Sequence, residues 1–286
     1  MKNKALKTYI YGLLALLICY SELTLASPFS DSVDTTVSTG FKLRTIVIDA
    51  GHGGRAGGAQ GAYSMEKNVT LAIALKLRQA IQKEFKDVNV LMTRTSDVTL
   101  ANGLRAVMAN ENKANLYISL HCNSLPNVRK VVNGKTVSVP NRSGKGVLFL
   151  INRFGRSNEQ VAAIRENQMA EEEESLTKRT EVKVDPAEAM MLNAFRDKFR
   201  KQSVHLANLI NNEFIDTDGR ASLGVIEQGV QVLANTSMPS ILIETGFINN
   251  PEEEDYLNSE EGQTEIVNSI VRGLKTYKNE VERVAP

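Results

Sequence analysis

Two histidines each follow a short apolar run of the sequence. His52 lies in residues 49–54 (DAGHGG), directly after the β-branched run 45–48, and His121 follows the apolar residues 116–120. Such runs predict buried strands, and strand ends in one sheet meet at a crevice that suits an active site. Because imidazole is a common zinc ligand, the pair predicts a metal site, although a histidine between glycines can also be a turn residue without a role.

Two carboxylates could complete this site. Glu66 stands where the loop after His52 enters a predicted helix, and it is the best candidate for a third metal ligand. A lone glutamate at a helix start is more often a first-turn charge favoured by the helix dipole, so this assignment depends on the two histidines. Glu244 ends the apolar run 240–243. A carboxylate buried there must be paired, metal-facing or shifted in pKa, which fits a general base.

The third histidine and the cysteine beside His121 are weaker candidates. His205 is flanked by leucines in a predicted helix, which favours a partly buried or surface role over metal binding. Cys122 could bind zinc through its thiolate. Neighbours along a strand face opposite sides of the sheet, however, so we expect Cys122 to pack in the core.

Strands and helices alternate along the chain, which is the rhythm of an α/β protein. Apolar runs predict strands at residues 45–49, 88–92, 116–120, 146–151 and 240–244. Segments with apolar residues at helical spacing predict helices at residues 68–85 and 104–112. Residues 128–139 hold Asn-Gly between two β-rich runs, which predicts a type I′ hairpin that projects as a surface flap. Residues 264–277 predict a closing amphipathic helix.

One long stretch, residues 157–214, differs from this pattern. It is polar and helix-prone, with four consecutive glutamates at 171–174 and a proline at position 186. We expect two helices joined by a loose linker, inserted into the domain.

Composition limits the class of protein. The chain has 286 residues, of which 42% are hydrophobic and 23% are charged, so one sizeable globular core is expected. The formal net charge of +1 lacks the basic excess that nucleic-acid binding normally requires.

Residues 1–26 predict a secretory signal peptide. Three lysines precede the apolar run 9–20, and Thr24 and Ala26 suit cleavage after Ala26. This apolar run is shorter than the roughly 20 residues that a membrane-spanning helix needs, so no transmembrane span is expected in the mature form. The alternative is that the segment stays uncleaved and anchors the protein. Residues 27–42 predict a flexible lead-in.

Cysteine usage agrees with this interpretation. Removal of the signal peptide leaves Cys122 alone, so no internal disulfide is expected. Lipidation at Cys19 is disfavoured because the small residue that usually precedes a lipoprotein cysteine is lacking.

Five segments form one ordered set: residues 48–54 (IDAGHGG), 65–68 (MEKN), 92–94 (MTR), 119–124 (SLHCNS) and 244–250 (ETGFINN). In order and spacing they resemble the zinc-dependent N-acetylmuramoyl-L-alanine amidases. The resemblance spans about residues 43–277. We therefore expect a catalytic domain over residues 43–280. It should be a single three-layer α/β domain, in which helices flank a central, mostly parallel mixed sheet. The inserted helical segment should be an addition to this domain.

The resemblance implies one zinc ion bound by His52, Glu66 and His121, with Glu244 assisting catalysis. It implies hydrolysis of the amide bond between N-acetylmuramic acid and L-alanine in peptidoglycan, for cell-wall remodelling or daughter-cell separation. Three protein ligands leave zinc one open position for a water, whose pKa zinc lowers from about 16 to roughly 7.

Two further residues of these motifs have open roles. Arg94 and Asn123 are candidates for contacting the substrate or for orienting a metal ligand. Asn123 could equally cap the end of its strand.

The inserted stretch bears on the resting state. In some relatives with a related Arg-Glu-Asn sequence, an inserted helix covers the zinc and supplies an inhibitory carboxylate until an activator protein displaces it. Residues 164–168 read IRENQ, so the resemblance implies that Glu166 or a nearby glutamate caps the metal at rest. A solvated charged face is the alternative.

Two other functions fit the same residues: a zinc peptidase or deacetylase with another substrate, and a noncatalytic wall-binding protein on the same scaffold. The intact ligand set argues against the second. Two imidazoles and a carboxylate bind several divalent ions, so the identity of the metal rests on the resemblance. We expect a periplasmic monomer that acts on peptidoglycan.

Overall fold

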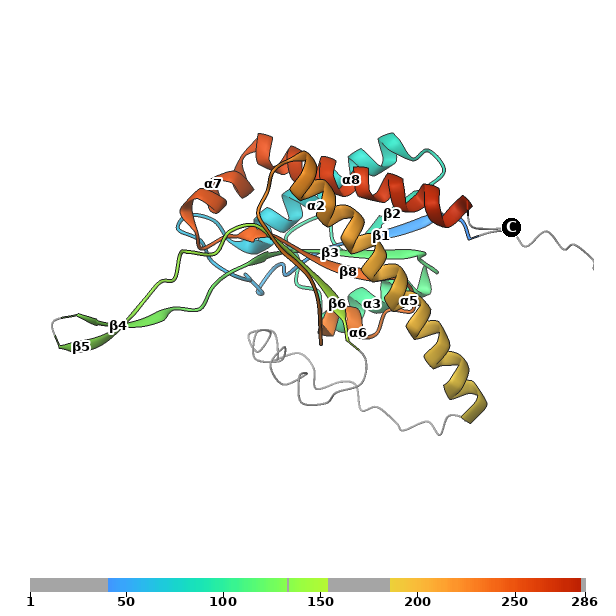
Figure 1. Ribbon diagram of the computed structural model, residues 1–286, viewed down its shortest axis with the longest axis horizontal. Coiled ribbons are helices and arrows are strands. Elements are labelled where there is room, and N and C mark those ends of the chain that lie inside the picture. The colour runs from blue at the N-terminus through green and yellow to red at the C-terminus, as the bar shows by residue number, and fades with distance from the viewer. Residues whose placement is uncertain (1–40, 133, 154–185, 284–286) are drawn as a thin grey trace, which may run out of the picture. The chain divides into compact units, whose positions relative to one another are not determined.

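The computed structural model describes residues 41–132, 134–153 and 186–283, which all belong to the unit Thr39–Pro286 (Figure 1). The predicted signal peptide, with Cys19, lies outside the described residues. So do residues 27–40 of the predicted lead-in and residues 154–185, which include Glu166.

Six strands form the central sheet, in the order β2-β1-β3-β8-β6-β7. Every neighbouring pair is parallel except β6 and β8, which are antiparallel. This confirms a mostly parallel mixed sheet. The strands are β1 (Thr45–Ala50), β2 (Asn89–Met92), β3 (Leu116–Asn123), β6 (Val147–Asn152), β7 (Ser222–Gln228) and β8 (Ser240–Phe247).

Helices cover both faces of this sheet, because successive side chains of each strand point to opposite faces. Ile48 and Ile118 point into the main core, where helices α2, α8 and α5 pack. Val47 and Tyr117, their neighbours in sequence, pack in a smaller core with α3 and α6. In the view of Figure 1, α2 and α8 lie above the sheet and α3 and α6 below it. The helices are α2 (Glu66–Glu84), α3 (Asn102–Glu111), α5 (Pro186–Asn212), α6 (Gln231–Ala234) and α8 (Glu260–Arg283).

The predicted hairpin is present. Strands β4 (Val128–Val132) and β5 (Lys135–Val139) pair antiparallel and form a separate two-stranded ribbon. Gly134 has a φ of 73°, the left-handed value that a type I′ turn requires. Asn133, the other central residue of the turn, lies outside the described residues.

The second half of the stretch predicted as an insertion belongs to the main core. Helix α5 begins at Pro186 and includes the buried Leu206 and Ile210, and the π-helical turn η2 (Glu213–Thr217) adds the buried Phe214. These residues close the main core against α8. An inserted element therefore stays a prediction only for the residues before Pro186, which lie outside the described ranges.

Several elements were not predicted, among them α6, β7 and α7 (Pro251–Asn258). Strand β7 is an edge strand whose residues on both faces are mostly half-buried, so its sequence carries no apolar alternation. Helix α7 begins with Pro251, and the side chain of Asn250 accepts a hydrogen bond from the backbone N–H of Glu252, 3.0 Å away. Among the described helices, none combines the length and apolarity that crossing a membrane requires.

Candidate metal centre

His52 lies in the loop that leaves the carboxyl end of β1. Its φ of 60° is in the left-handed region, which non-glycine residues seldom adopt. Arg105 holds this conformation, because its Nη2 donates to the carbonyl oxygen of His52 at 2.7 Å. The loop thus turns back over the end of the sheet and presents the imidazole there.

Glu66 is the first residue of α2 and is only 3% exposed. One carboxylate oxygen, Oε2, accepts the backbone N–H of Ala59 at 2.7 Å and lies 3.1 Å from Nε2 of His52. The other, Oε1, accepts the backbone N–H of Cys122 at 2.9 Å and lies 2.9 Å from Nδ1 of His121. These contacts fix both oxygens of the carboxylate between the two imidazoles.

His121 lies near the end of β3, where the pairing of β3 with β8 shifts register. Such an irregularity re-aims side chains at the end of a strand. The His52 and His121 rings stand edge to face, with centroids 5.0 Å apart. Gly51 makes this approach possible, because a Cβ on it would lie 2.5 Å from Cε1 of His121.

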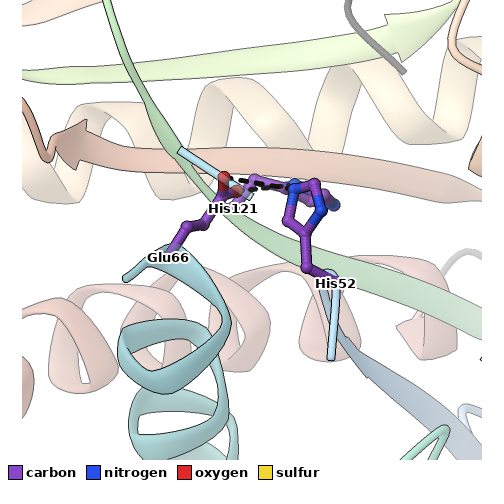
Figure 2. Close-up of side chains that lie close together, drawn as sticks. All are labelled: His52, Glu66 and His121. Carbon is purple, nitrogen blue, oxygen red and sulfur yellow. Dashed lines mark hydrogen bonds and ion pairs between the residues drawn. The ribbon is translucent and has the colours of Figure 1, made fainter. Parts of the chain in front are cut away.

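The three side chains reach one point from three different elements (Figure 2). Their ligand atoms all lie within 4.8 Å of one another, and they form the one such group in the part of the chain that the structure describes. Zinc takes imidazole nitrogens and carboxylate oxygens at about 2.0–2.2 Å. The donor types and their convergence therefore fit a zinc ion with three protein ligands.

The protonation of Glu66 also suits a cation site. Burial alone would raise the pKa of its carboxyl, but hydrogen bonds from His121 and His52 outweigh burial and hold the pKa well below the usual range. A buried anion is thereby available between the two imidazoles.

Glu244 lies beside this centre, on the strand next to β3. Its Cα pairs with that of His121 in the parallel register of β3 and β8, so both side chains leave the same face of the sheet. Glu244 is half-buried. Its carboxylate is not one of the converging donors, which leaves it as a group next to the metal centre.

The backbone around His52 depends on a buried ion pair that the sequence analysis missed. Nη1 of Arg105 lies 2.6 Å from Oδ1 of Asp49, and both side chains are almost completely buried. Thr93 and Ser119 donate hydroxyl hydrogen bonds of 2.6 Å to the same carboxylate. Burial tends to raise the pKa of Asp49, but the positive charge of Arg105 and these hydrogen bonds lower it to about 2.

Arg94 acts on the same loop from the other side. Its Nε donates to the carbonyl oxygen of Ala50, and its Nη2 donates to those of Gly51 and Lys67, each at 2.8 Å. Arg94 is buried, and these contacts join the loop after β1 to the start of α2. The contacts describe a residue that positions His52 and Glu66.

A second unpredicted support comes from α7. The buried carboxylate of Glu254 accepts the backbone N–H groups of Ala62, Tyr63 and Ser64 at 2.7–2.9 Å. It thereby fixes the loop that leads into Glu66. The sequence gives no local sign of this contact, because about 190 residues separate Glu254 from the loop.

The remaining candidates lie as follows. Oδ1 of Asn123 accepts the backbone N–H of Ser124 at 2.7 Å, which caps the end of β3. Cys122 is buried in the main core, as expected, and burial raises the pKa of its thiol. His205 is half-exposed on α5, where Nε2 contacts Glu280, and it is not part of the metal centre.

The sequence matches a known family over most of its length. The family described as N-acetylmuramoyl-L-alanine amidase matches residues 46–276. AmiA of Salmonella typhimurium is 29% identical over 257 residues, which cover 90% of this chain and 83% of the relative. AmiC of Escherichia coli O6:H1 is 30% identical, and the match covers 81% of this chain. It covers only 52% of AmiC, so this chain spans about half the length of that relative.

Solved structures with amidase names share the fold. The N-acetylmuramoyl-L-alanine amidase from Clostridium difficile 630 has a TM-score of 0.59 at 23% identity, over 84% of this chain and 98% of that one. The CwlD amidase of Clostridioides difficile, solved in complex with the GerS lipoprotein, has a TM-score of 0.59 at 21% identity, over 83% and 99% of the two chains.

Proposed function

The chain belongs to the N-acetylmuramoyl-L-alanine amidase family, and on that premise we propose that it uses one zinc ion to hydrolyse the amide bond between N-acetylmuramic acid and L-alanine in peptidoglycan. His52, Glu66 and His121 would hold the zinc. The observation that carries the proposal is the convergence of their three donor atoms within 4.8 Å at one edge of the sheet. Zinc bound there supplies a Lewis acid that polarises the amide carbonyl and acidifies water.

Glu244 is proposed as the residue that moves the proton. It accepts a proton from the attacking water as the oxygen–carbon bond forms, and it delivers that proton to the L-alanine nitrogen as the carbon–nitrogen bond breaks. Its support is the register with His121, which sets both side chains on one face of adjacent strands. The products are a free lactyl carboxylate and a stem peptide with a free amino terminus.

The roles of the remaining residues follow from their contacts. We assign Arg94 to positioning the loop of His52, and Asn123 to the end of β3, rather than to substrate binding. Arg94 donates hydrogen bonds to backbone carbonyl oxygens, and Asn123 accepts one from a backbone N–H, so both side chains support the backbone around the site.

The resting state and the cellular setting are further parts of the proposal. We propose that Glu166 or a nearby glutamate of the inserted stretch caps the zinc until an activator protein displaces it, in an exported, periplasmic enzyme that acts during wall remodelling or daughter-cell separation. A protein of the same fold has been solved with a lipoprotein partner, which supports a search for one here. Deletion of residues 157–185 should raise turnover, and a folded deletion variant with unchanged turnover would contradict the autoinhibition.

The reaction itself is tested by its product. Zinc-loaded protein is incubated with purified peptidoglycan, and the released material is analysed by mass spectrometry. We expect intact stem peptides that begin with a free L-alanine. Shortened peptides or deacetylated sugars would instead identify a peptidase or a deacetylase, and the absence of any product would favour a noncatalytic wall-binding protein.

A further inference from the structure

A β-ribbon extends from the edge of the sheet that holds the metal centre. Residues 126–145, which we call the arm, join the end of β3 to the start of β6 and contain β4 and β5. Figure 1 shows this ribbon, in green, projecting away from the sheet. Since β3 also carries His121, the arm begins a few residues beyond a proposed metal ligand.

The arm is strongly cationic. It contains five basic residues and no Asp or Glu, although the whole chain has a formal net charge of only +1. The rest of the chain is therefore net negative. Lys145 pairs with Glu252 at the base of the arm. Four exposed cations form no ion pair with any described residue: Arg129, Lys130, Lys135 and Arg142.

Apolar side chains accompany these charges. Val131, Val132 and Val137 are 72%, 49% and 38% exposed. The antiparallel register pairs Lys130 with Val137 and Val132 with Lys135, so two lysines and two valines share one face. An isolated two-stranded ribbon is only marginally stable in water, and exposed apolar side chains that are contiguous and rimmed by polar ones mark an interaction surface.

The base of the arm is fixed to the site. Nδ2 of Asn249 donates to the carbonyl oxygens of Leu125, directly before the arm, and of Asn141, near its end, at 2.9 Å each. Nδ2 of Asn250 donates to that of Gly144 at 2.8 Å. Both asparagines follow β8, the strand of Glu244. The segment directly after β8, the strand that carries the proposed proton-transfer group, therefore holds the base of the arm.

We propose that the arm binds the peptidoglycan polymer through the carboxylates of its stem peptides and so holds the strand at the metal centre. The proposal rests on the proposed function, whose substrate carries several carboxylates on each stem peptide. Charge complementarity favours this partner, because the arm offers four exposed cations that pair with no acidic side chain in the described part of the chain. The outer edges of β4 and β5 pair with no other described strand, and such edges can pair with an extended peptide while the valines contact its apolar parts.

Lysines on ribbon edges have a second known effect, which is to prevent association between copies of a protein. That effect requires no affinity for carboxylates. Binding to peptidoglycan, and its loss when carboxylates are blocked, therefore distinguishes the two explanations.

The test measures co-sedimentation with insoluble peptidoglycan. The full zinc-loaded chain carries Glu244→Gln so that the polymer is hydrolysed slowly. In this background, the arm variant combines Arg129→Gln, Lys130→Gln, Lys135→Gln and Arg142→Gln. The control variant removes four exposed cations elsewhere that also form no ion pair with a described residue, by changing Lys42, Lys83, Lys198 and Lys201 to Gln.

We expect the arm variant to bind about tenfold more weakly or worse, since four exposed charge contacts are lost and each contributes modestly to binding. The control variant should bind like the parent. Exchanging arginine and lysine at the four arm positions should preserve binding. Prior amidation of the peptidoglycan carboxylates should bring the parent down to the level of the arm variant.

Equal binding by the arm and control variants would overturn the proposal. So would an arm-dependent affinity for vesicles of phosphatidylglycerol and phosphatidylethanolamine without one for peptidoglycan, which would identify a membrane as the partner. Neither outcome depends on hydrolysis. A failed product analysis with intact arm-dependent binding would count against the amidase reaction and leave the arm assignment standing.

Discussion

The Cα atoms of His121 on β3 and Glu244 on β8 are directly paired, so a histidine of the metal centre and the neighbouring carboxylate leave the same face of two adjacent parallel strands. Glu244 is also paired with Leu148 of β6 on its other side. The position of this carboxylate is thus set by central strands. His52 and Glu66, in contrast, are positioned by the loop after β1 and by the start of α2. Metal binding and proton transfer can therefore be tested separately.

Glu66→Gln should lower the affinity for zinc by at least about 100-fold, because the only anionic donor of the centre is lost. The amide oxygen can still accept one of the two backbone hydrogen bonds that the carboxylate accepts, and thermal unfolding of the same sample checks that the fold persists. Competition with a chromogenic chelator measures the affinity. Glu84→Gln, at the other end of the same helix and in an ion pair with Lys275, is the matched control. Equal zinc affinity in the two variants would remove Glu66 from the ligand set.

Gly51→Ala should disturb the centre without touching a ligand. The new Cβ would lie 2.5 Å from Cε1 of His121 and 2.7 Å from the carbonyl oxygen of Leu120, and a strand backbone cannot easily move. We expect a loss of stability of about 1–3 kcal/mol and weaker zinc binding. Gly103→Ala, in α3, meets no atom within 4 Å and should leave zinc binding unchanged. Full zinc affinity in Gly51→Ala would contradict the close approach of loop and imidazole.

Arg105→Met should destabilise the protein by about 3–5 kcal/mol, because it leaves the buried carboxylate of Asp49 without its cation. Urea unfolding measures the loss. Arg200→Met is the comparison, since it breaks a half-exposed pair with Glu227 and should cost less than about 1 kcal/mol. Similar losses in the two variants would mean that the buried pair does not support the loop of His52.

The pH dependence of stability should include a step from Asp49. Its pKa is about 2 in the folded protein and close to 3.9 in an unfolded chain. Since the folded pKa is depressed, the stabilisation is complete above about pH 4 and is lost as the pH falls toward 2, by about 2 kcal/mol. Asp49→Asn should be less stable at neutral pH and should lack this step. Parallel pH profiles of parent and variant between pH 4 and pH 2 would rule the step out.

The sequence was sufficient for five of the six strands of the central sheet and for placing the two histidines at strand ends. Strands β1, β3 and β8 are buried on both faces, so they appear as continuous apolar runs that end at a functional residue. Strand β7 was not predicted because it is an edge strand whose residues are mostly half-buried on both faces, and it contains a glycine at 224 with positive φ. Its pairing partner β6 lies about 75 residues earlier in the chain.

Glu66 shows where local reasoning ends. A first-turn glutamate and a metal ligand look the same in sequence, and only the contact with His121, 55 residues away, separates them. Arg105 and Glu254 were missed for the same reason. Each is a charged residue buried by distant partners, and a single sequence carries no local sign of such burial.

We propose that Glu244 moves the proton and that the zinc centre binds its metal without this carboxylate. Steady-state turnover of peptidoglycan by Glu244→Gln, with the zinc content of the same sample determined, tests this most directly. We predict one zinc per chain and a kcat about 100- to 10,000-fold below that of the parent. A variant that keeps its zinc and also keeps the parental kcat would contradict the assignment.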